Sequence, residues 1–146
     1  MSRVAVIGGG PAGIMAAAAA ADCGHDSVLL EKNEKLGKKL FLTGKGRCNI
    51  TNICDTDDFF ANIPRNPKFL YSALYGFSNT DIVELINANG VPTKAERGKR
   101  VFPASDKSSD VIKALTRHLN SSGAELRLNT EVSGIRKAGS GFELTV

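Results

Sequence analysis

The sequence predicts an α/β fold: a Rossmann-like βαβ unit with a parallel sheet, plus a small β-hairpin or meander at the C-terminal end. Three observations predict it. A β-branched run at 3–7 is followed at once by a glycine-rich turn, and the turn is followed by an alanine-rich stretch. A second apolar run, 27–30, ends at an acidic residue. Two parallel strands joined by a helix form a right-handed crossover, so these segments make one βαβ unit.

The remaining segments extend this pattern. A helix is expected at 14–23, with Gly24 in the left-handed position that ends a helix. Residues 33–62 show neither a helix nor a strand period, so a long ordered loop is expected there. Further helices are expected at 66–77, at 80–89 after a cap at Asn79 or Thr80, and from Ser105 to about 122. Extended segments are expected at 92–102, 125–128, 131–136 and 142–146, the last two joined by a glycine turn.

The first motif is Gly8-x-Gly10-x-x-Gly13, between the first strand and the first helix. Gly8 allows the tight turn, Gly10 lets the backbone approach a pyrophosphate, and Gly13 lets helix and strand pack closely. Glu31 follows the second strand, where a carboxylate accepts hydrogen bonds from ribose hydroxyls and disfavours a 2′-phosphate. The alternative is a glycine turn with a purely structural role. Because strand, glycines, helix and acid all occur in order, the sequence predicts a dinucleotide site.

The second motif is TGKGRCNITN at 43–52. It is not a P-loop, because a lysine stands where the first glycine is required and Gly46 replaces the required Ser or Thr. Gly44 and Gly46 could bring backbone N–H groups close to a phosphate or a flavin ring. Arg47 could neutralise phosphate charge, and Asn49 could donate to a polar ring edge. An ordinary polar loop is an equally good interpretation of these residues alone.

The three cysteines, Cys23, Cys48 and Cys54, have no metal-ligand spacing, so no metal site is predicted. They are interpreted as reduced thiols in a cytoplasmic protein. Arg47 could lower the pKa of Cys48 and favour its thiolate. Packing is the preferred role for Cys48, because no second cysteine is spaced for exchange.

The net charge is +4, and six lysines and arginines fall within 32–47. This cluster suits the phosphates of a cofactor or of nucleic acid, or it forms a solvated loop. Nucleic acid is disfavoured, because Tyr71, Tyr75 and Phe77 fall near helical spacing and are predicted to lie in the core. The apolar N-terminal run is not interpreted as a signal or membrane segment, because three glycines and Pro11 interrupt it.

Three ordered segments carry a resemblance to a known family: GKKL at 37–40, the TGKGRCNITN motif, and GKRVFPASDKSSDV at 98–111. The chain resembles bacterial NAD(P)/FAD-dependent oxidoreductases described as aminoacetone-oxidase-like or bile-acid-reductase-like. Pro11 and Ala12 in the glycine turn also resemble FAD-binding flavoproteins more than NAD dehydrogenases. The resemblance implies FAD as cofactor, NAD(P)H as hydride donor and a small-molecule substrate.

The resemblance also implies that 1–146 is the N-terminal segment of a discontinuous FAD-binding domain. An inserted β-rich domain and a C-terminal return segment are expected beyond it. By resemblance, the FAD site is lined by Ala12, Glu31, Lys32, Lys39, Gly46, Arg47, Asn49 and Val132. With the motif residues, the predicted cofactor-binding set is Gly8, Gly10, Pro11, Ala12, Gly13, Glu31, Lys32, Lys39, Gly44, Gly46, Arg47, Cys48, Asn49 and Val132. Lys45 departs from the family, which usually has glycine there.

The function predicted from the sequence is the FAD-binding part of a flavin-dependent oxidoreductase. The flavin would carry the redox chemistry, so no catalytic acid or base is assigned. A non-catalytic nucleotide-binding module or a truncated product is the alternative. An RNA-modifying flavoprotein fragment is a weaker alternative.

Overall fold

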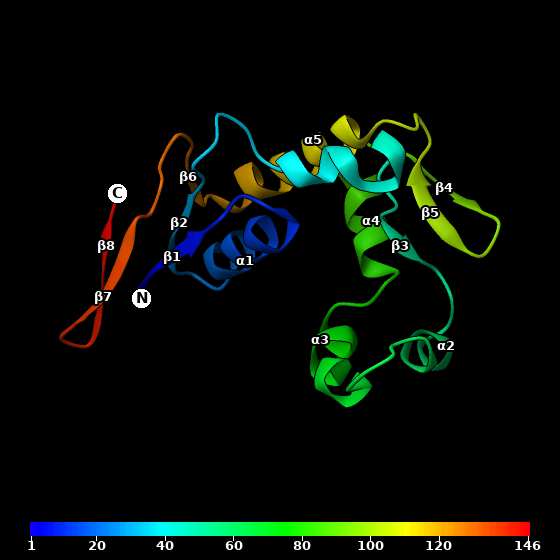
Figure 1. The fold of residues 1–146 in the computed structure, drawn as a ribbon, viewed down its shortest axis with the longest axis horizontal. Helices are drawn as coiled ribbons and strands as arrows, with labels where there is room; N and C mark the ends of the chain where they lie inside the picture. Colours follow the sequence, from blue (N-terminus) through cyan, green and yellow to red (C-terminus); the bar gives the residue numbers. More distant parts are fainter. The chain divides into compact units, whose positions relative to one another are not determined.

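The computed structural model describes all residues, 1–146, and the chain divides into two compact units (Figure 1). The first unit consists of Met1–Leu40 and Leu115–Val146, and the second consists of Phe41–Ala114. Helix α5 (Ser108–Ser122) is continuous across the second boundary. No helix in the chain is both long enough and apolar enough to cross a membrane.

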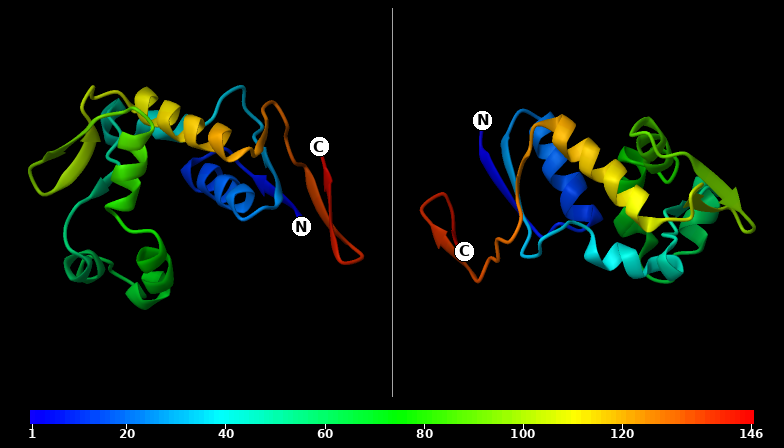
Figure 2. Two further views of the ribbon diagram at one scale, coloured as in Figure 1. Left: turned by 180° about the vertical axis from the view of Figure 1, so that it is seen from behind. Right: turned by 90° about the horizontal axis from the view of Figure 1, so that it is seen from above.

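The first unit confirms the predicted parallel sheet. Its strands are β1 (Arg3–Ile7), β2 (Asp26–Leu30) and β6 (Glu125–Arg127), in the order β1-β2-β6 and all parallel. The central strand β2 is buried along nearly its whole length, with Leu29 fully buried. Both edges of β2 are paired with parallel strands, and helix α1 packs against it (Figure 2), which suits its apolar sequence.

A C-terminal hairpin completes the first unit, as predicted. It pairs β7 (Gly134–Ala138) with β8 (Gly141–Thr145) in antiparallel register. The strand predicted at 131–136 instead begins at Gly134 and ends at Ala138, because the pairing with β8 begins only at Gly134. Residues 130–132 are thereby left outside the hairpin ladder, and they line the cavity described below.

Helix α1 (Pro11–Asp22) connects β1 to β2 and begins three residues earlier than predicted. Proline suits the first helical position, because its fixed φ matches the helix. An N–H at this position would have no acceptor within the helix, so its absence costs nothing. The helix ends as predicted at Gly24, which has φ +79°. The N–H of Gly24 donates to Ala21 O (2.8 Å), and the N–H of His25 donates to Ala20 O (3.1 Å).

The second unit is built around an antiparallel sheet. Strands β4 (Thr93–Glu96) and β5 (Arg100–Pro103) form the hairpin predicted around Gly98, and β3 (Thr51–Asn52) pairs with the other edge of β5. The helical segments are η1 (Lys38–Gly46), whose first three residues belong to the first unit, α2 (Thr56–Ala61), η2 (Pro67–Leu70), α3 (Tyr71–Gly76) and α4 (Asp81–Ala88). Segment η1 is not continuous, because Thr43, Gly44 and Lys45 have non-helical backbone angles.

The expectation of a loop throughout 33–62 was wrong. Helix α2 begins after Asp55, whose carboxylate accepts a hydrogen bond from the N–H of Asp58 (2.9 Å). This N-cap compensates for a helix of only six residues. A hydrophobic period cannot show in so short a helix, whereas the cap residue was a usable signal.

Two other helix starts also differ from the sequence prediction. Helix α5 begins at Ser108 rather than Ser105, because Asp106 has φ +56° and cannot continue a helix. Thr80 occupies the predicted cap position of α4 but makes no side-chain cap hydrogen bond. Asn79 instead donates its amide to the carbonyl oxygens of Asn52 (2.7 Å) and Cys54 (2.9 Å).

The expected aromatic core on 66–77 was also wrong. Tyr71, Tyr75 and Phe77 are 41%, 71% and 40% exposed, and Phe69 is 84% exposed. The segment forms only η2 and α3, and neither contains a buried residue. These elements are too short to lay a full apolar face on a core. The rings of Tyr71 and Tyr75 instead pack on the buried ring of Phe60.

Candidate functional site

A cavity of about 730 Å³ opens in the first unit where β1 and β2 end. The glycine turn forms one part of its wall, and segments 30–33, 37–40 and 130–132 form the rest. This volume lies within the range of small-molecule and cofactor sites. The predicted site residues that line it are Gly8, Gly10, Pro11, Ala12, Gly13, Glu31, Lys32, Lys39 and Val132.

The glycines of the turn have different physical roles. A Cβ atom at Gly13 would lie 1.9 Å from the backbone oxygen of Gly8, so helix α1 can sit this close to the turn only with glycine there. Gly8 has φ +104°, which L residues rarely adopt. A Cβ at Gly10 would meet no atom within 4 Å. Gly10 lines the cavity, so the space beside its α carbon is empty.

Gly9 also has a structural role, although the glycine motif leaves its position unspecified. A Cβ there would lie 2.3 Å from Leu36 Cδ2 and 3.0 Å from Glu31 Oε2. The oxygen of Gly9 also accepts a hydrogen bond from the N–H of Gly37 (2.8 Å). Segment 36–37 is therefore fastened to the turn, with Leu36 buried. The run of three glycines was the only available signal for this contact.

The start of helix α1 supplies backbone donors. Ile14 is the first residue to donate within the helix, to Gly10 O (2.9 Å). The N–H groups of Ala12 and Gly13 belong to the first turn, which has no intrahelical acceptors, and Pro11 has no N–H. Both residues line the cavity, so the positive end of the helix dipole faces it. Such an end is suited to a phosphate.

Glu31 lies buried at the end of β2 and is tied to the turn. Its Oε2 accepts a hydrogen bond from the N–H of Gly9 (2.6 Å). Its Oε1 accepts from the N–H of Asn33 (2.8 Å) and from the Asn33 side-chain amide. A carboxylate offers about four acceptor positions. The protein uses three of them, which leaves one on Oε2.

These contacts set the charge of the carboxylate. Burial alone raises the pKa of Glu31, but hydrogen bonds from the backbone N–H groups of Asn33 and Gly9 lower it. The Asn33 amide and the Lys32 charge act in the same direction, and the net pKa lies below its ordinary value. Glu31 is therefore an anion at neutral pH, and both of its oxygens act only as hydrogen-bond acceptors.

The lysines at the cavity are differently engaged. Lys38 pairs with Glu34 (2.9 Å) and also donates to Asn33 Oδ1 (3.0 Å). Lys32 lies 3.8 Å from Glu131, and both of these side chains are exposed. Exposed pairs of this kind contribute little to stability. Lys32 can thus turn toward a bound anion at small cost.

The other predicted site residues, Gly44, Gly46, Arg47, Cys48 and Asn49, belong to the second unit. Cys48 is buried, and burial raises the pKa of its thiol although a hydrogen bond with Thr43 opposes this. This favours the packing role over a reactive thiolate. The Asn49 amide, oriented toward its acceptors, donates to the carbonyl oxygens of Val101 (3.3 Å) and Thr51 (3.1 Å).

Arg47 is the most engaged side chain of this motif. Its Nε and Nη2 donate to Asp106 Oδ1 (2.8 and 2.6 Å), and Nη2 also donates to Glu96. Its guanidinium carbon lies 4.3 Å from the centre of the Phe102 ring. Lys94 completes the group, since its Nζ lies 2.6 Å from Asp106 Oδ2 and 3.7 Å from Glu96 Oε1.

These pairings shift the pKa of three of the four charged groups, Arg47, Glu96 and Asp106. The hydrogen bonds that Arg47 donates to Glu96 and Asp106 raise its pKa. A hydrogen bond from Arg47 lowers the pKa of Glu96, and hydrogen bonds from Lys94 and Arg47 lower the pKa of Asp106. Two cations therefore face two anions, so the network is neutral at pH 7.

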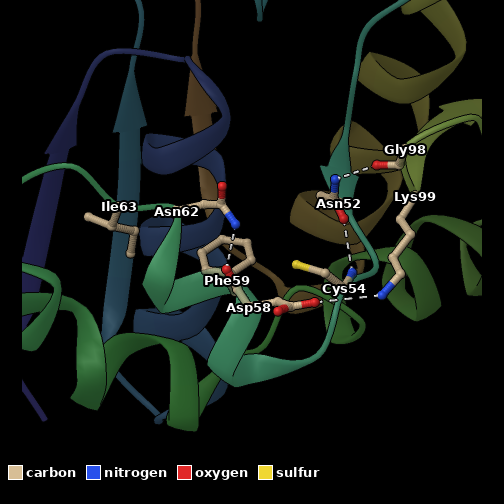
Figure 3. Close-up of a pocket in the computed structure, with 8 residues that line it drawn as sticks. All are labelled: Asn52, Cys54, Asp58, Phe59, Asn62, Ile63, Gly98 and Lys99. Atoms are coloured by element: carbon tan, nitrogen blue, oxygen red, sulfur yellow. Dashed lines mark hydrogen bonds and ion pairs between the residues drawn. The ribbon is translucent and has the colours of Figure 1, made fainter.

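A second cavity, of about 490 Å³, lies in the second unit between α2 and the β4–β5 turn (Figure 3). None of the predicted site residues lines it. Asn52, the last residue of the TGKGRCNITN motif, donates its amide to Gly98 O (2.7 Å) and accepts from the N–H of Cys54 (2.9 Å). Lys99 lies 3.8 Å from Asp58 across the same cavity. Its polar side chains are thus used in internal contacts.

Comparison with known proteins identifies the family. The family described as HI0933-like protein Rossmann domain matches residues 2–146, nearly the whole chain. The chain belongs to the HI0933-like Rossmann-domain family. This confirms the resemblance drawn from the three sequence segments and the predicted Rossmann-like fold.

Two curated proteins are similar to this chain along nearly its whole length. The chain is 33% identical over 144 residues to the 3-dehydro-bile acid delta(4,6)-reductase of Clostridium scindens, covering 97% of this chain and 34% of the relative. It is 30% identical over 139 residues to the ribosomal RNA dihydrouridine synthase of Escherichia coli, covering 95% of this chain and 34% of the relative. The chain thus spans about a third of the length of these relatives.

Solved structures share the fold at low identity. THI4 of Thermovibrio ammonificans superposes with a TM-score of 0.60 at 12% identity, covering 97% of this chain and 45% of that protein. A flavocytochrome c3 fumarate reductase superposes with a TM-score of 0.59 at 21% identity, covering 92% and 28%. These similarities confirm the fold of the chain. At such low identity they carry no information about its chemistry.

The glycine geometry predicts opposite effects for two alanine substitutions. Gly13→Ala should lower the free energy of unfolding by at least about 2 kcal/mol, because its Cβ would overlap a backbone oxygen. Gly10→Ala should change it by less than about 1 kcal/mol, because its Cβ enters open space and its φ of −79° suits alanine. Urea unfolding followed by circular dichroism measures both. Equal losses in the two variants would contradict the proposed close approach of α1 to the turn.

The pKa of Glu31 predicts a pH-dependent contribution to stability. Since the folded state lowers this pKa, the contribution is complete above the ordinary glutamate value of about 4.3 and is lost as pH falls through the lower folded value. Glu31→Gln should therefore destabilise by about 1–2 kcal/mol at pH 7, where charged hydrogen bonds are replaced by neutral ones. The difference from wild type should shrink toward pH 3. Thermal unfolding across this pH range tests it, and a difference that grows on acidification would be inconsistent with an ionised, hydrogen-bonded Glu31.

Proposed function

We propose that this chain is the FAD-binding part of a flavin-dependent oxidoreductase. The ADP half of FAD would occupy the cavity of the first unit, and the 43–52 loop would serve the flavin half. The observation that carries the proposal is that the glycine turn, the start of α1 and Glu31 all line one cavity. When bound, FAD would supply the redox chemistry, and the protein would supply binding and orientation.

Each part of the cavity suits one part of the nucleotide. The pyrophosphate would approach the backbone at Gly10 and accept hydrogen bonds from the N–H groups of Ala12 and Gly13. A ribose hydroxyl would donate to the remaining acceptor position on Glu31 Oε2. Val132 lies on the same cavity wall and would contact the adenine through its backbone. The carboxylate disfavours a 2′-phosphate, which supports FAD rather than NADP at this position.

The sequence relatives support a reductase. The names of the two curated relatives describe a reductase and a synthase of dihydrouridine, which is uridine with two added hydrogen atoms. Both names are consistent with hydrogen transfer to an unsaturated substrate. We propose that the full-length protein uses NAD(P)H as its hydride donor and reduces a small molecule. Mixing the full-length protein anaerobically with NADH or NADPH should bleach the flavin absorbance near 450 nm on the order of seconds or faster, since typical turnover is about 1–1000 per second.

FAD binding itself is predicted to depend on Gly10. In the full-length protein, Gly10→Ala should weaken FAD binding by about tenfold or more, because the Cβ fills the space that the pyrophosphate would approach. Gly141→Ala is the matched control. Its Cβ also meets nothing within 4 Å, but Gly141 lies in β8, outside the cavity. Isothermal titration calorimetry measures both affinities.

The same titration separates the alternatives. Full-length wild type that binds no FAD would refute the proposed function. ADP binding as tight as FAD binding, with no oxidation of NAD(P)H, would instead favour a non-catalytic nucleotide-binding module. Equal FAD affinity in wild type and Gly10→Ala would show that the pyrophosphate lies elsewhere.

RNA modification is a second candidate. The relative named ribosomal RNA dihydrouridine synthase favours it, as do the exposed aromatic side chains of η2 and α3, since stacking surfaces bind single-stranded bases. Mass spectrometry of dihydrouridine in ribosomal RNA, with and without the gene, decides between the substrates. Loss of dihydrouridine on deletion and its return on complementation would favour RNA, whereas an unchanged content would favour a small molecule.

A further inference from the structure

The basic residue of the TGKGRCNITN motif is surrounded by acids. Arg47 donates three hydrogen bonds to two carboxylates, Asp106 and Glu96, and its guanidinium lies over the ring of Phe102. Lys94 faces the same two carboxylates, so no net positive charge is left for a phosphate. An arginine with these contacts can hold neighbouring segments in place, and its charge is already compensated.

The segment that Arg47 holds is an unusual turn. Gly44, Lys45, Gly46 and Cys48 all have positive φ, at +54°, +56°, +87° and +62°. Lysine and cysteine rarely adopt this conformation, so the surrounding structure must impose it. Within the turn, the N–H of Arg47 donates to Gly44 O (3.2 Å) and that of Cys48 donates to Thr43 O (3.2 Å).

Two asparagines of the motif also attach it to the β4–β5 hairpin. Asn49 donates to Val101 O, and Asn52 donates to Gly98 O, as Figure 3 shows for Asn52. The N–H of Ile50 donates to Val101 O (2.8 Å). A Cβ at Gly44 would lie 3.5 Å from Phe102, so the turn also packs on the ring beneath Arg47. The hairpin is therefore the support on which the turn is shaped.

We infer that Arg47 is a positioning residue, whose guanidinium, held by Glu96 and Asp106 over Phe102, fixes the 43–48 turn against the hairpin. This inference rests on the proposed function only in that the turn is expected to serve the flavin half of FAD. Arg47 affects that binding through the shape of the turn, and its charge stays with the two carboxylates. This positioning role replaces the role in phosphate neutralisation that the sequence predicts for Arg47.

The test compares the arginine with its partners in the full-length protein. The variants are Arg47→Met, Arg47→Lys and the double variant Glu96→Gln/Asp106→Asn. Positioning predicts that all three weaken FAD binding by a similar factor of about tenfold, a typical coupling within one ion-pair network. Combining Arg47→Met with the double variant should add no further loss. The visible spectrum of the flavin that remains bound should also change, because the turn serves the ring.

The opposite pattern would overturn the inference. If Arg47 bound phosphate, Glu96→Gln/Asp106→Asn would free its charge and leave FAD affinity unchanged or higher. Arg47→Lys would retain most of the affinity, and the flavin spectrum would be unaffected. Arg136→Met is the matched control, since it removes an arginine from the exposed Arg136–Glu143 pair of the β7–β8 hairpin. It should change none of these measurements.

A second readout does not depend on FAD. Cys48 is 2% exposed and Cys23 is exposed, so iodoacetamide followed by peptide mass spectrometry should label Cys23 rapidly and Cys48 slowly. Each network variant should label Cys48 faster while Cys23 is unchanged. Protection of Cys48 in Arg47→Lys and in Glu96→Gln/Asp106→Asn would overturn the inference even if Arg47→Met fails to fold. Failure of wild type to bind FAD would refute the proposed function. The labelling of Cys48 relative to Cys23 would then still decide the role of Arg47.

Discussion

The close approach of helix α1 to the turn after β1 is the constraint on which the first unit depends. Only a hydrogen at the α position of Gly13 fits beside the oxygen of Gly8. This contact brings the start of α1 to the end of β1, where the unpaired N–H groups of the first helical turn meet the cavity. This geometry supports the proposed dinucleotide site at the carboxyl ends of the parallel strands.

Glu31 couples that turn to the next strand. Its carboxylate takes the N–H of Gly9 on one oxygen and two donors from Asn33 on the other. The same side chain therefore orders the turn and offers an acceptor to a ligand. A buried anion is stable here because three hydrogen bonds offset the loss of hydration. Under the proposed function, Glu31 would therefore serve both the structure of the turn and the binding of the nucleotide.

The fold was largely predictable because its signals are local and periodic. The β-branched run of β1, the alanines of α1 and the glycine at position 24 each determine an element without help from distant residues. The hairpins around Gly98 and Gly139 were predictable for the same reason. By contrast, α2 was hidden because six residues carry no period, and Tyr71 and Tyr75 were misplaced because spacing does not report whether a core lies opposite. Neighbouring elements, rather than sequence spacing, decide burial.

The placement of the candidate site residues was predictable where it depends on a motif and unpredictable where it depends on long-range pairing. Gly10, Gly13 and Glu31 lie together as their spacing indicated. The contact between Gly9 and Leu36, and the pairing of Arg47 with Glu96 and Asp106, join residues far apart in sequence. An arginine in a glycine-rich loop suggested phosphate binding, and only the structure shows the two acids that hold it.

The most direct measurement is a crystal structure of the full-length protein with ADP bound. The pyrophosphate should lie within hydrogen-bonding distance of the N–H groups of Ala12 and Gly13, and a ribose hydroxyl should donate to Glu31 Oε2. A nucleotide bound outside this cavity, or a pyrophosphate that makes no contact with the glycine turn, would contradict it.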